Sequence, residues 1–281
     1  MQDKGFRRFS IGTIWLWLAI FSLIPSFLLL MTSILVQGDG ELVRLQLTVD
    51  NYLRLFNPDY LRVFLRSFVL AGTCTLACLL LAYPFSYCIA RLPEQYKGIG
   101  LLLVIIPFWT SSLIRSYAIV ALLKTHGIIN TFLMWLGIIN APIQLMYTNT
   151  ATLIGLIYTL LPLMILPLYA SIEKLDIRFI DAARDLGAKK HQVFFKVILP
   201  LTLPGIFAGC LLVFLPAMTL FYIPDLLGGA KTILIGNIIQ NQFLAARDWP
   251  MGATISVTLT LLMGLVLFVY WRRYPNRQEL L

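Results

Sequence analysis

Apolar runs of about 20 residues or more alternate with short polar segments along almost the whole chain. A helix needs about 20 residues to cross a hydrocarbon layer of about 30 Å, so each run predicts one membrane-spanning helix. Five of the six runs contain proline, which indicates kinked helices, and the third span is expected to be interrupted at Pro107. The predicted spans are Ile11–Val36, Val63–Ala90, Ile99–Leu123, Ala151–Ile172, Leu201–Tyr222 and Met251–Trp271.

The composition agrees with this pattern. Of the 281 residues, 59% are hydrophobic and 12% are charged, a balance that excludes a soluble globular protein. The predicted fold class is therefore an all-α polytopic membrane protein with six transmembrane helices and little chain left for a soluble domain. The first apolar run is too long for a signal peptide and has no small-x-small cleavage site, so we expect it to remain as the first span.

The net charge of +9 raises the possibility of a nucleic-acid partner. The basic residues flank apolar runs and form no single patch, which excludes that partner. Counting lysine and arginine, 14 fall on the side that carries the N-tail, the loop 91–98, the loop 173–200 and the C-tail, and 7 on the other. The excess predicts that both termini and the loop 173–200 are cytoplasmic.

The segment Glu173–Pro200 separates the fourth and fifth apolar runs and holds ten charged residues. Asp176 is suited to cap a helix start, and Gly187 to end that helix in a left-handed conformation. Between them, Ile177, Ile180, Ala182 or Ala183, and Leu186 repeat at helical spacing. A second amphipathic segment follows at 193–197, and Pro200 is expected to stop or kink it. A helix-turn-helix between spans indicates a docking surface.

This segment resembles the "EAA" loop of type I binding-protein-dependent ABC permeases. The matching pattern is Asp181-Ala182-Ala183, three residues, Gly187, nine residues, then Val197-x-Leu199-Pro200, with Asp181 in place of Glu and Val197 in place of Ile. The resemblance implies the type I ABC importer permease fold and a coupling helix that sits in a groove of the ATP-hydrolysing subunit. It assigns ATPase coupling to Asp181, Ala182, Ala183, Gly187, Leu199 and Pro200.

The same resemblance divides the chain into three parts. Residues 1–62 would hold the N-terminal tail, the first span and an external loop. Residues 63–271 would form the type 1 transmembrane permease domain, with its coupling loop at 173–200, and residues 272–281 a cytoplasmic C-tail. Two short apolar helices are also expected in the outer loops, at Gly127–Gly137 and Ile233–Phe243, either as lids over the outer mouth or as interfacial packing helices.

Four further segments are similar to B-type membrane subunits of spermidine/putrescine permeases: PFWTSSLIRSYA, LYASIEKLD, LPAMTLFYIPDLLGGAK and ARDWPMGA. The similarity extends from about Thr48 onward. It implies a polyamine importer in a bacterial inner membrane, with a second homologous permease subunit, two copies of an ATP-binding subunit, a periplasmic polyamine-binding protein and membrane lipid around it. A type I permease for another small solute and a gradient-driven secondary transporter are the alternatives.

No feature of the chain predicts an enzyme. The segment Gly228–Thr232 looks superficially like a Walker A loop but lacks the first glycine of that motif. The spans contain almost no acid that could serve as a catalytic carboxylate, and no metal-ligand spacing occurs, so neither a catalytic residue nor a cofactor is expected in this chain. ATP and magnesium would be bound by the partner ATPase. A gradient-driven carrier usually needs ionisable groups inside the membrane, and here Arg115 is the only charge that lies clearly inside the membrane rather than near the end of a span.

A polyamine path should offer aromatic faces and few fixed charges, because cation–π contacts hold a flexible polycation weakly enough to release it. The candidate liners are Trp109, Tyr117, Tyr158 and Tyr222, with Asp225 at the mouth. The alternative is that these aromatic residues anchor the spans at the interface or pack the core. For Arg115, a snorkelling side chain packed against its neighbours competes with a gate or a partner contact.

Overall fold

The computed structural model describes residues 4–38, 42–229 and 232–273, which are largely helical. The chain divides into two compact units, one made of residues 1–62 and 238–281 and the other of residues 63–237. In the described part, six helical segments are long and apolar enough to cross a membrane, as predicted: Ser10–Ser33, Pro58–Ala90, Ser112–Trp135, Asn149–Glu173, Lys190–Thr219 and Trp249–Val269. Most of the predicted C-tail, and residues 230–231 of the Walker-like segment, lie outside the described residues.

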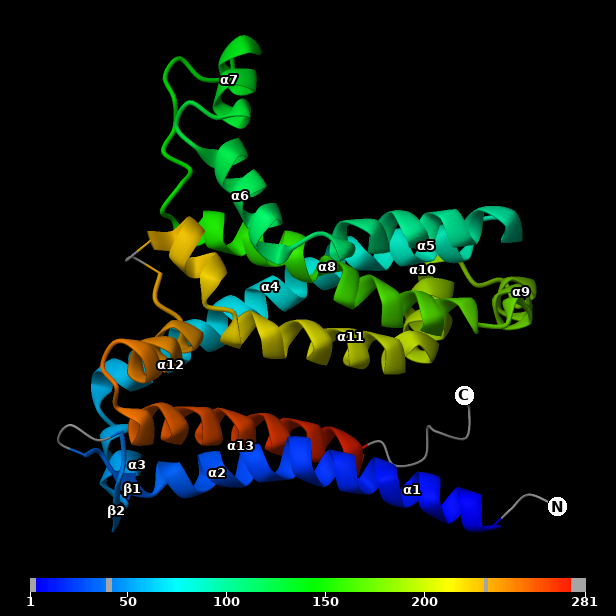
Figure 1. Ribbon diagram of the computed structural model, residues 1–281. Helices are drawn as coiled ribbons and strands as arrows, with labels where there is room; N and C mark the ends of the chain where they lie inside the picture. Colours follow the sequence, from blue (N-terminus) through cyan, green and yellow to red (C-terminus); the bar gives the residue numbers. More distant parts are fainter. Residues whose placement is uncertain (1–3, 39–41, 230–231, 274–281) are drawn as a thin grey trace. The chain divides into compact units, whose positions relative to one another are not determined.

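In the first unit, α1 (Lys4–Leu18), the π-helical segment η1 (Ala19–Leu23) and α2 (Ile24–Ser33) follow one another without a break. Helix α13 (Trp249–Arg273) packs along α2 (Figure 1). Where they meet, the Thr254 hydroxyl donates a hydrogen bond to the carbonyl of Ser33 at 2.9 Å. A two-stranded hairpin, β1 (Leu35–Val36) and β2 (Arg44–Leu47), and the short α3 (Asp50–Arg54) complete this unit.

The second unit contains the segments on which the function depends. Helix α4 (Pro58–Ala90) enters it from the first unit, and α12 (Ile235–Leu244) leaves it. The elements between them are α5 (Glu94–Trp109), α6 (Ser112–Leu123), α7 (Ile128–Trp135), α8 (Asn149–Glu173), α9 (Ile177–Asp185), α10 (Lys190–Val193), the π-helical η2 (Phe194–Ile198), α11 (Leu199–Thr219) and the π-helical η3 (Pro224–Gly228). Helices α7 and α12 confirm the two short helices predicted in these loops.

Helices α8 and α11 pack against each other along their lengths (Figure 1). A Cβ atom added to Gly205 of α11 would lie 2.7 Å from the carbonyl oxygen of Pro167 and against the Ser171 side chain. A Cβ atom at Gly209 would lie 2.6 Å from the Met164 sulfur. The two glycines therefore let the helix backbones approach, which is the role of small residues spaced four apart in membrane helices.

The third predicted span differs from its prediction. The helix passes through Pro107 and ends at Trp109, because the extended backbone at Thr110 (ψ 150°) and Ser111 (ψ 132°) separates α5 from α6. The Thr110 hydroxyl donates to the Pro107 carbonyl at 2.7 Å, so that carbonyl keeps a partner where the helix ends. Helices α6 and α7 then lead away from α8 and α11 (Figure 1), and together they make the span-length apolar segment.

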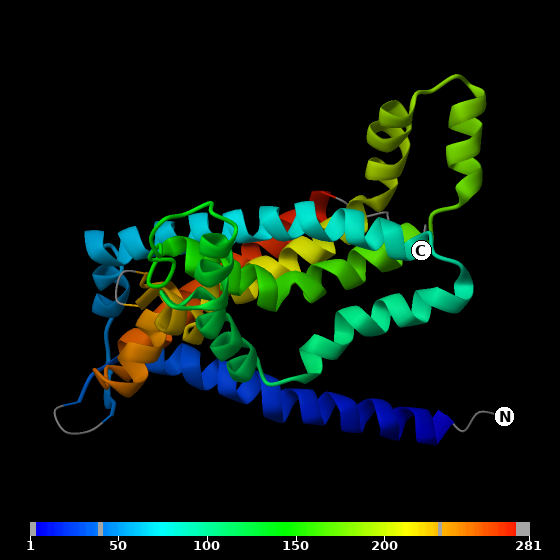
Figure 2. The ribbon, with the colours of Figure 1, turned by 90° about the horizontal axis from the view of Figure 1, so that it is seen from above.

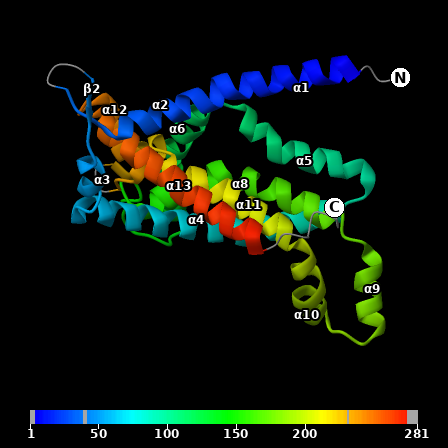
Figure 3. The same cartoon turned by 90° about the horizontal axis from the view of Figure 1, so that it is seen from below.

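Of the two effects predicted for Pro200, the structure shows a kink and not a stop, because the helical segment changes direction between α10 and α11 without ending (Figures 2 and 3). Residues 190–219 are one continuous helical segment in which η2 replaces a turn of α-helix just before Pro200. Pro25 likewise lies at the second residue after a π-helical segment, here η1. A π-helical turn shifts the hydrogen bonds from i−4 to i−5, and such a local change accommodates a residue that lacks an N–H donor.

Candidate functional site

The predicted coupling segment forms a helical hairpin that projects beyond the ends of α8 and α11 (Figures 2 and 3). Helix α9 follows α8 after a short turn, and α10 leads through η2 into α11. The Gln192 side chain accepts a hydrogen bond from the Lys189 backbone N–H at 2.8 Å and so caps the start of α10. The hairpin therefore consists of two short helices fixed to the ends of two long ones.

The two residues predicted to delimit α9 have the expected geometry. The Asp176 carboxylate accepts a hydrogen bond from the Arg178 backbone N–H at 2.9 Å, as an N-cap does. Gly187 has φ +81°, and its N–H donates to the Arg184 carbonyl at 2.8 Å. The N–H of Ala188 donates to the Ala183 carbonyl at 3.0 Å. These two bonds form a Schellman motif, which needs a left-handed residue at the position of Gly187.

The hairpin has an apolar core of its own, in which Ile180, Val193 and Ile198 are buried. Phe194 packs against this cluster and meets the Tyr83 ring of α4 edge-on, with ring centroids 5.4 Å apart. This core, together with its contacts to α4, holds the hairpin against the long helices. The hairpin is therefore positioned by packing as well as by the chain connections.

The six predicted coupling residues do not share one surface. Asp181, Ala182 and Gly187 are exposed, Ala183 packs against the hairpin core, and Leu199 and Pro200 are half-buried in the first turn of α11. The structure thus separates a tip, which another protein could contact, from a base that joins the hairpin to the fifth span.

Of the residues that repeat at helical spacing in this segment, Ile180 is buried and Ala183 is half-buried, whereas Ile177 and Leu186 are exposed. Leu186 is 88% exposed, and Ile177 and Phe179 are also exposed. Exposed apolar side chains beside a small-residue surface are typical of a protein contact. Leu186 and Phe179 are the candidate docking residues that sequence reasoning missed. Phe179 could have been found, because it lies off the apolar stripe of α9.

The predicted path residues are distributed over several elements of the second unit. Trp109 ends α5 and is 77% exposed, Tyr117 and Tyr158 are exposed on α6 and α8, and Tyr222 is half-buried after α11. Among the described residues, no hydrogen bond or ring contact joins any two of these four or joins them to Asp225. This chain alone therefore does not assemble them into one site.

Asp225 of η3 is held by an amide. The Asn237 side chain donates hydrogen bonds to the Asp225 carboxylate at 2.5 Å and to the Phe221 carbonyl at 2.9 Å. Partial burial raises the pKa of the Asp225 carboxyl above its usual range, and the Asn237 hydrogen bond opposes that rise. In the described part of the chain no lysine or arginine forms an ion pair with this carboxylate.

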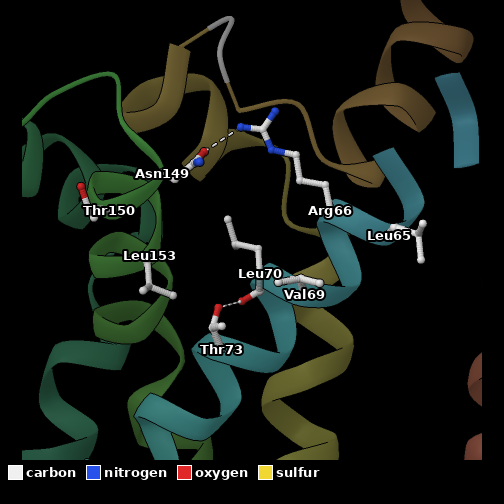
Figure 4. Close-up of a pocket in the computed structure, with 8 residues that line it drawn as sticks. All are labelled: Leu65, Arg66, Val69, Leu70, Thr73, Asn149, Thr150 and Leu153. Atoms are coloured by element: carbon white, nitrogen blue, oxygen red, sulfur yellow. Dashed lines mark hydrogen bonds between the residues drawn. The ribbon is translucent and has the colours of Figure 1, made fainter. Parts of the chain in front are cut away.

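A groove of about 410 Å³ lies between α4 and the start of α8 (Figure 4). At its upper end in that view, the Arg66 guanidinium donates to the Asn149 side-chain oxygen at 2.8 Å. The other lining residues are mostly apolar: Leu65, Val69, Leu70, Thr73, Thr150 and Leu153. None of the predicted path residues lines this groove, so it is a separate feature of the surface.

Within the described residues, six apolar helices and a projecting hairpin between the fourth and fifth define the class: a multi-pass membrane protein with the type I ABC importer permease fold. Residues 6–277 match the family model described as "Binding-protein-dependent transport system inner membrane component". The chain belongs to this family. Its members are permease subunits of transporters rather than enzymes.

The chain is 53% identical over 271 residues to the spermidine/putrescine transport system permease protein PotB of Salmonella typhimurium (strain LT2), covering 96% of this chain and 94% of the relative. It is 54% identical over 256 residues to PotB of Escherichia coli (strain K12), covering 91% of this chain and 93% of that relative. Among solved structures it resembles a chain of a bacterial alginate ABC transporter crystallised with an alginate pentasaccharide-bound periplasmic protein. The TM-score is 0.76 and the sequence identity is 17%, and the match covers 98% of this chain and 95% of that chain. That likeness concerns the fold alone.

Proposed function

We propose that this chain is a membrane-spanning subunit of an ATP-driven importer of spermidine and putrescine. The identity of more than half of the residues to spermidine/putrescine permeases, over more than nine-tenths of the chain, carries this proposal. The transporter would also contain a second homologous permease subunit, two ATP-binding subunits that hold ATP and magnesium, and a periplasmic polyamine-binding protein. The membrane would be the bacterial inner membrane, with both termini in the cytoplasm.

The tip of the hairpin is the proposed contact with the ATPase. Ala182 and Gly187 leave room for close approach, Leu186 supplies an apolar anchor, and the hairpin core with the Schellman turn fixes their positions. The base of the hairpin passes directly into α11, so movement of the tip reaches the membrane helices through η2. Coupling then requires no nucleotide site in this chain.

For the path itself, we propose that Trp109, Tyr117, Tyr158 and Tyr222 offer ring faces to ammonium groups and that Asp225 attracts them at the mouth. The exposure of Trp109, Tyr117 and Tyr158 supports a wall completed by another subunit. An acid with no cationic partner among the described residues supports an entry role for Asp225. The ring contacts are each weak, about 0.5–2 kcal/mol, which suits release.

The test is uptake of radiolabelled spermidine and putrescine by the reconstituted transporter, with and without ATP and the binding protein. Uptake should require both components. Uptake without nucleotide that collapses with an ionophore would instead establish a gradient-driven carrier. Accumulation of other solutes in place of polyamines would establish a type I permease of different specificity.

The path residues are tested with W109A and Y222A, which should lower uptake without lowering assembly. Trp135 provides a matched control because its exposed fraction, 76%, is almost the same as that of Trp109, 77%. It lies on α7 and is not assigned to the path. W135A should leave uptake unchanged. If W109A and Y222A both transport at the wild-type rate, the two residues do not belong to the path.

A further inference from the structure

Arg115 is a buried cation without a counter-charge in the described chain. It lies in the first turns of α6, and only 7% of its surface is exposed. Its Nε and Nη1 atoms are both buried and have no hydrogen-bond partner. The guanidinium carbon lies 5.4 Å from the centroid of the Phe108 ring, on the other side of the break between α5 and α6.

Such an arrangement is unfavourable for the isolated chain. Buried charges in folded proteins are almost always paired, because removing a charge from water costs far more than one ring contact returns. Buried N–H groups are likewise hydrogen-bonded in the great majority of cases. An acceptor for Arg115 is therefore expected in the assembled protein.

In the described part of the chain, no acid forms an ion pair with Arg115. From residue 95 to residue 172 there is no Asp or Glu at all. At the edges of that stretch, Glu94 and Glu173 both lie near Lys97, at 2.7 and 3.5 Å. Asp225 is bound to Asn237. The proposed substrate is itself a cation, so it cannot neutralise Arg115 either.

The surroundings favour a protein partner over lipid. A lipid-seeking arginine extends its guanidinium to the surface and the headgroups, whereas this one is folded onto Phe108 and buried. Ser111, whose carbonyl accepts the Arg115 backbone N–H at 3.1 Å, is exposed one turn earlier, so the break gives access to this region. Helix α6 also exposes Leu113 and Ile114, an apolar surface on which another helix could pack.

We propose that Arg115 forms an ion pair with a carboxylate of the second permease subunit, presented by a helix packed at the break between α5 and α6. The proposal rests on the proposed function, because it requires that subunit. The pair would hold the two permease chains in register at the point where α6 leaves α8 and α11.

The experiment compares R115M, which keeps much of the volume and removes the charge, with R62M as a control, since Arg62 is an exposed arginine of α4. Each variant is expressed with the second permease subunit and the ATPase, and also alone. For R115M, recovery of the second subunit should fall at least about thirtyfold, the usual consequence of breaking a buried charge pair. R62M should recover it normally.

The melting temperature of the chain purified alone distinguishes a partner for Arg115 in the second subunit from a structural role within this chain. If Arg115 is unpaired there, R115M should melt at or above the wild-type temperature, since it removes an uncompensated charge. In the complex, R115E should be rescued by one acid-to-arginine change in the second subunit, found by replacing its membrane acids in turn.

Normal recovery of the second subunit with R115M would overturn the proposal, as would a large loss of stability in the isolated variant. Loss of bound phospholipid from isolated R115M, detected by native mass spectrometry, would assign Arg115 to lipid and also overturn it. Failure of the wild-type chain to recover any second permease subunit would instead count against the proposed function.

Discussion

Gly187 provides the sharpest test of the coupling hairpin. Its φ of +81° lies in the left-handed region, and a Cβ atom added there would meet no other atom within 4 Å. Replacement by alanine therefore introduces no clash, and its only cost is that of placing an L-residue in this conformation, about 1–2 kcal/mol. A cost of this size reduces the population of the native turn about 5- to 30-fold relative to its alternatives.

The chain contains a matched control. Gly137 follows α7 with φ +70°, and a Cβ atom there also meets nothing within 4 Å. G137A and G187A should therefore destabilise their own turns to a similar extent. Both should leave the membrane helices assembled, because neither added Cβ atom meets another atom within 4 Å. Only G187A should uncouple ATP hydrolysis from transport, because only its turn carries the proposed ATPase contact.

The assay measures polyamine uptake and binding-protein-stimulated ATP hydrolysis in the same proteoliposomes. We expect G187A to lower uptake several-fold, G187N to retain most of it because asparagine tolerates the left-handed region, and G187D to abolish it by adding a charge at the tip. The reasoning is refuted if G187D co-purifies with its ATPase and transports normally, or if G137A is impaired as much as G187A.

Three further outcomes follow from the contacts described. D176A should cost about 1 kcal/mol of local helix stability, seen as faster hydrogen exchange in α9, whereas D176N should not. G205A should lower the melting temperature through overpacking of about 1–3 kcal/mol, whereas G72A, which meets no atom within 4 Å, should be neutral or stabilising. N237A removes the hydrogen bond that lowers the pKa of Asp225, so the pKa should rise further. The fall in uptake on the acid side of the pH profile should then occur at higher pH. If that side of the profile does not move, Asp225 is not the titrating group.

The raised pKa of Asp225 also makes the stability of the fold depend on pH. Since the folded-state pKa of Asp225 is raised, the protonated form is favoured on folding. Stability is therefore lost as the pH rises from the ordinary range of an aspartate through the raised value. N237A should extend that loss to higher pH. Thermal melts at a series of pH values measure it, with wild type as the reference.

The features that sequence predicted correctly are those set by short-range physics. The span count follows from the length of apolar runs, and the limits of α9 follow from Asp176 and Gly187, whose partners lie within five residues. Helices α7 and α12 were predicted for the same reason. Each depends on neighbours along the chain, so one sequence contains the information.

Features decided by tertiary packing were not predictable in this way. Pro107 was expected to interrupt the third span, but the position of the break depends on how Thr110 and Ser111 are held. Leu186 fits the apolar period of α9 and is nevertheless exposed, and its spacing along the chain does not show which side of the hairpin it faces. For Arg115, the sequence shows a charge in a span but not whether a partner reaches it.

The unbroken helical segment Lys190–Thr219 has a mechanical consequence. The segment bends between α10 and α11 (Figures 2 and 3); the 21 residues of α11 at 1.5 Å per residue form an arm about 32 Å long, and the contact of Phe194 with Tyr83 supports the segment close to the bend. A bent arm supported near its bend works as a lever, so a small tilt imposed at α10 becomes a larger sideways displacement at Thr219. The wide turn η2 lies close to that pivot, and its length sets the ratio of the two arms. Inserting or deleting one residue there should therefore change the size of the stroke without changing which proteins bind.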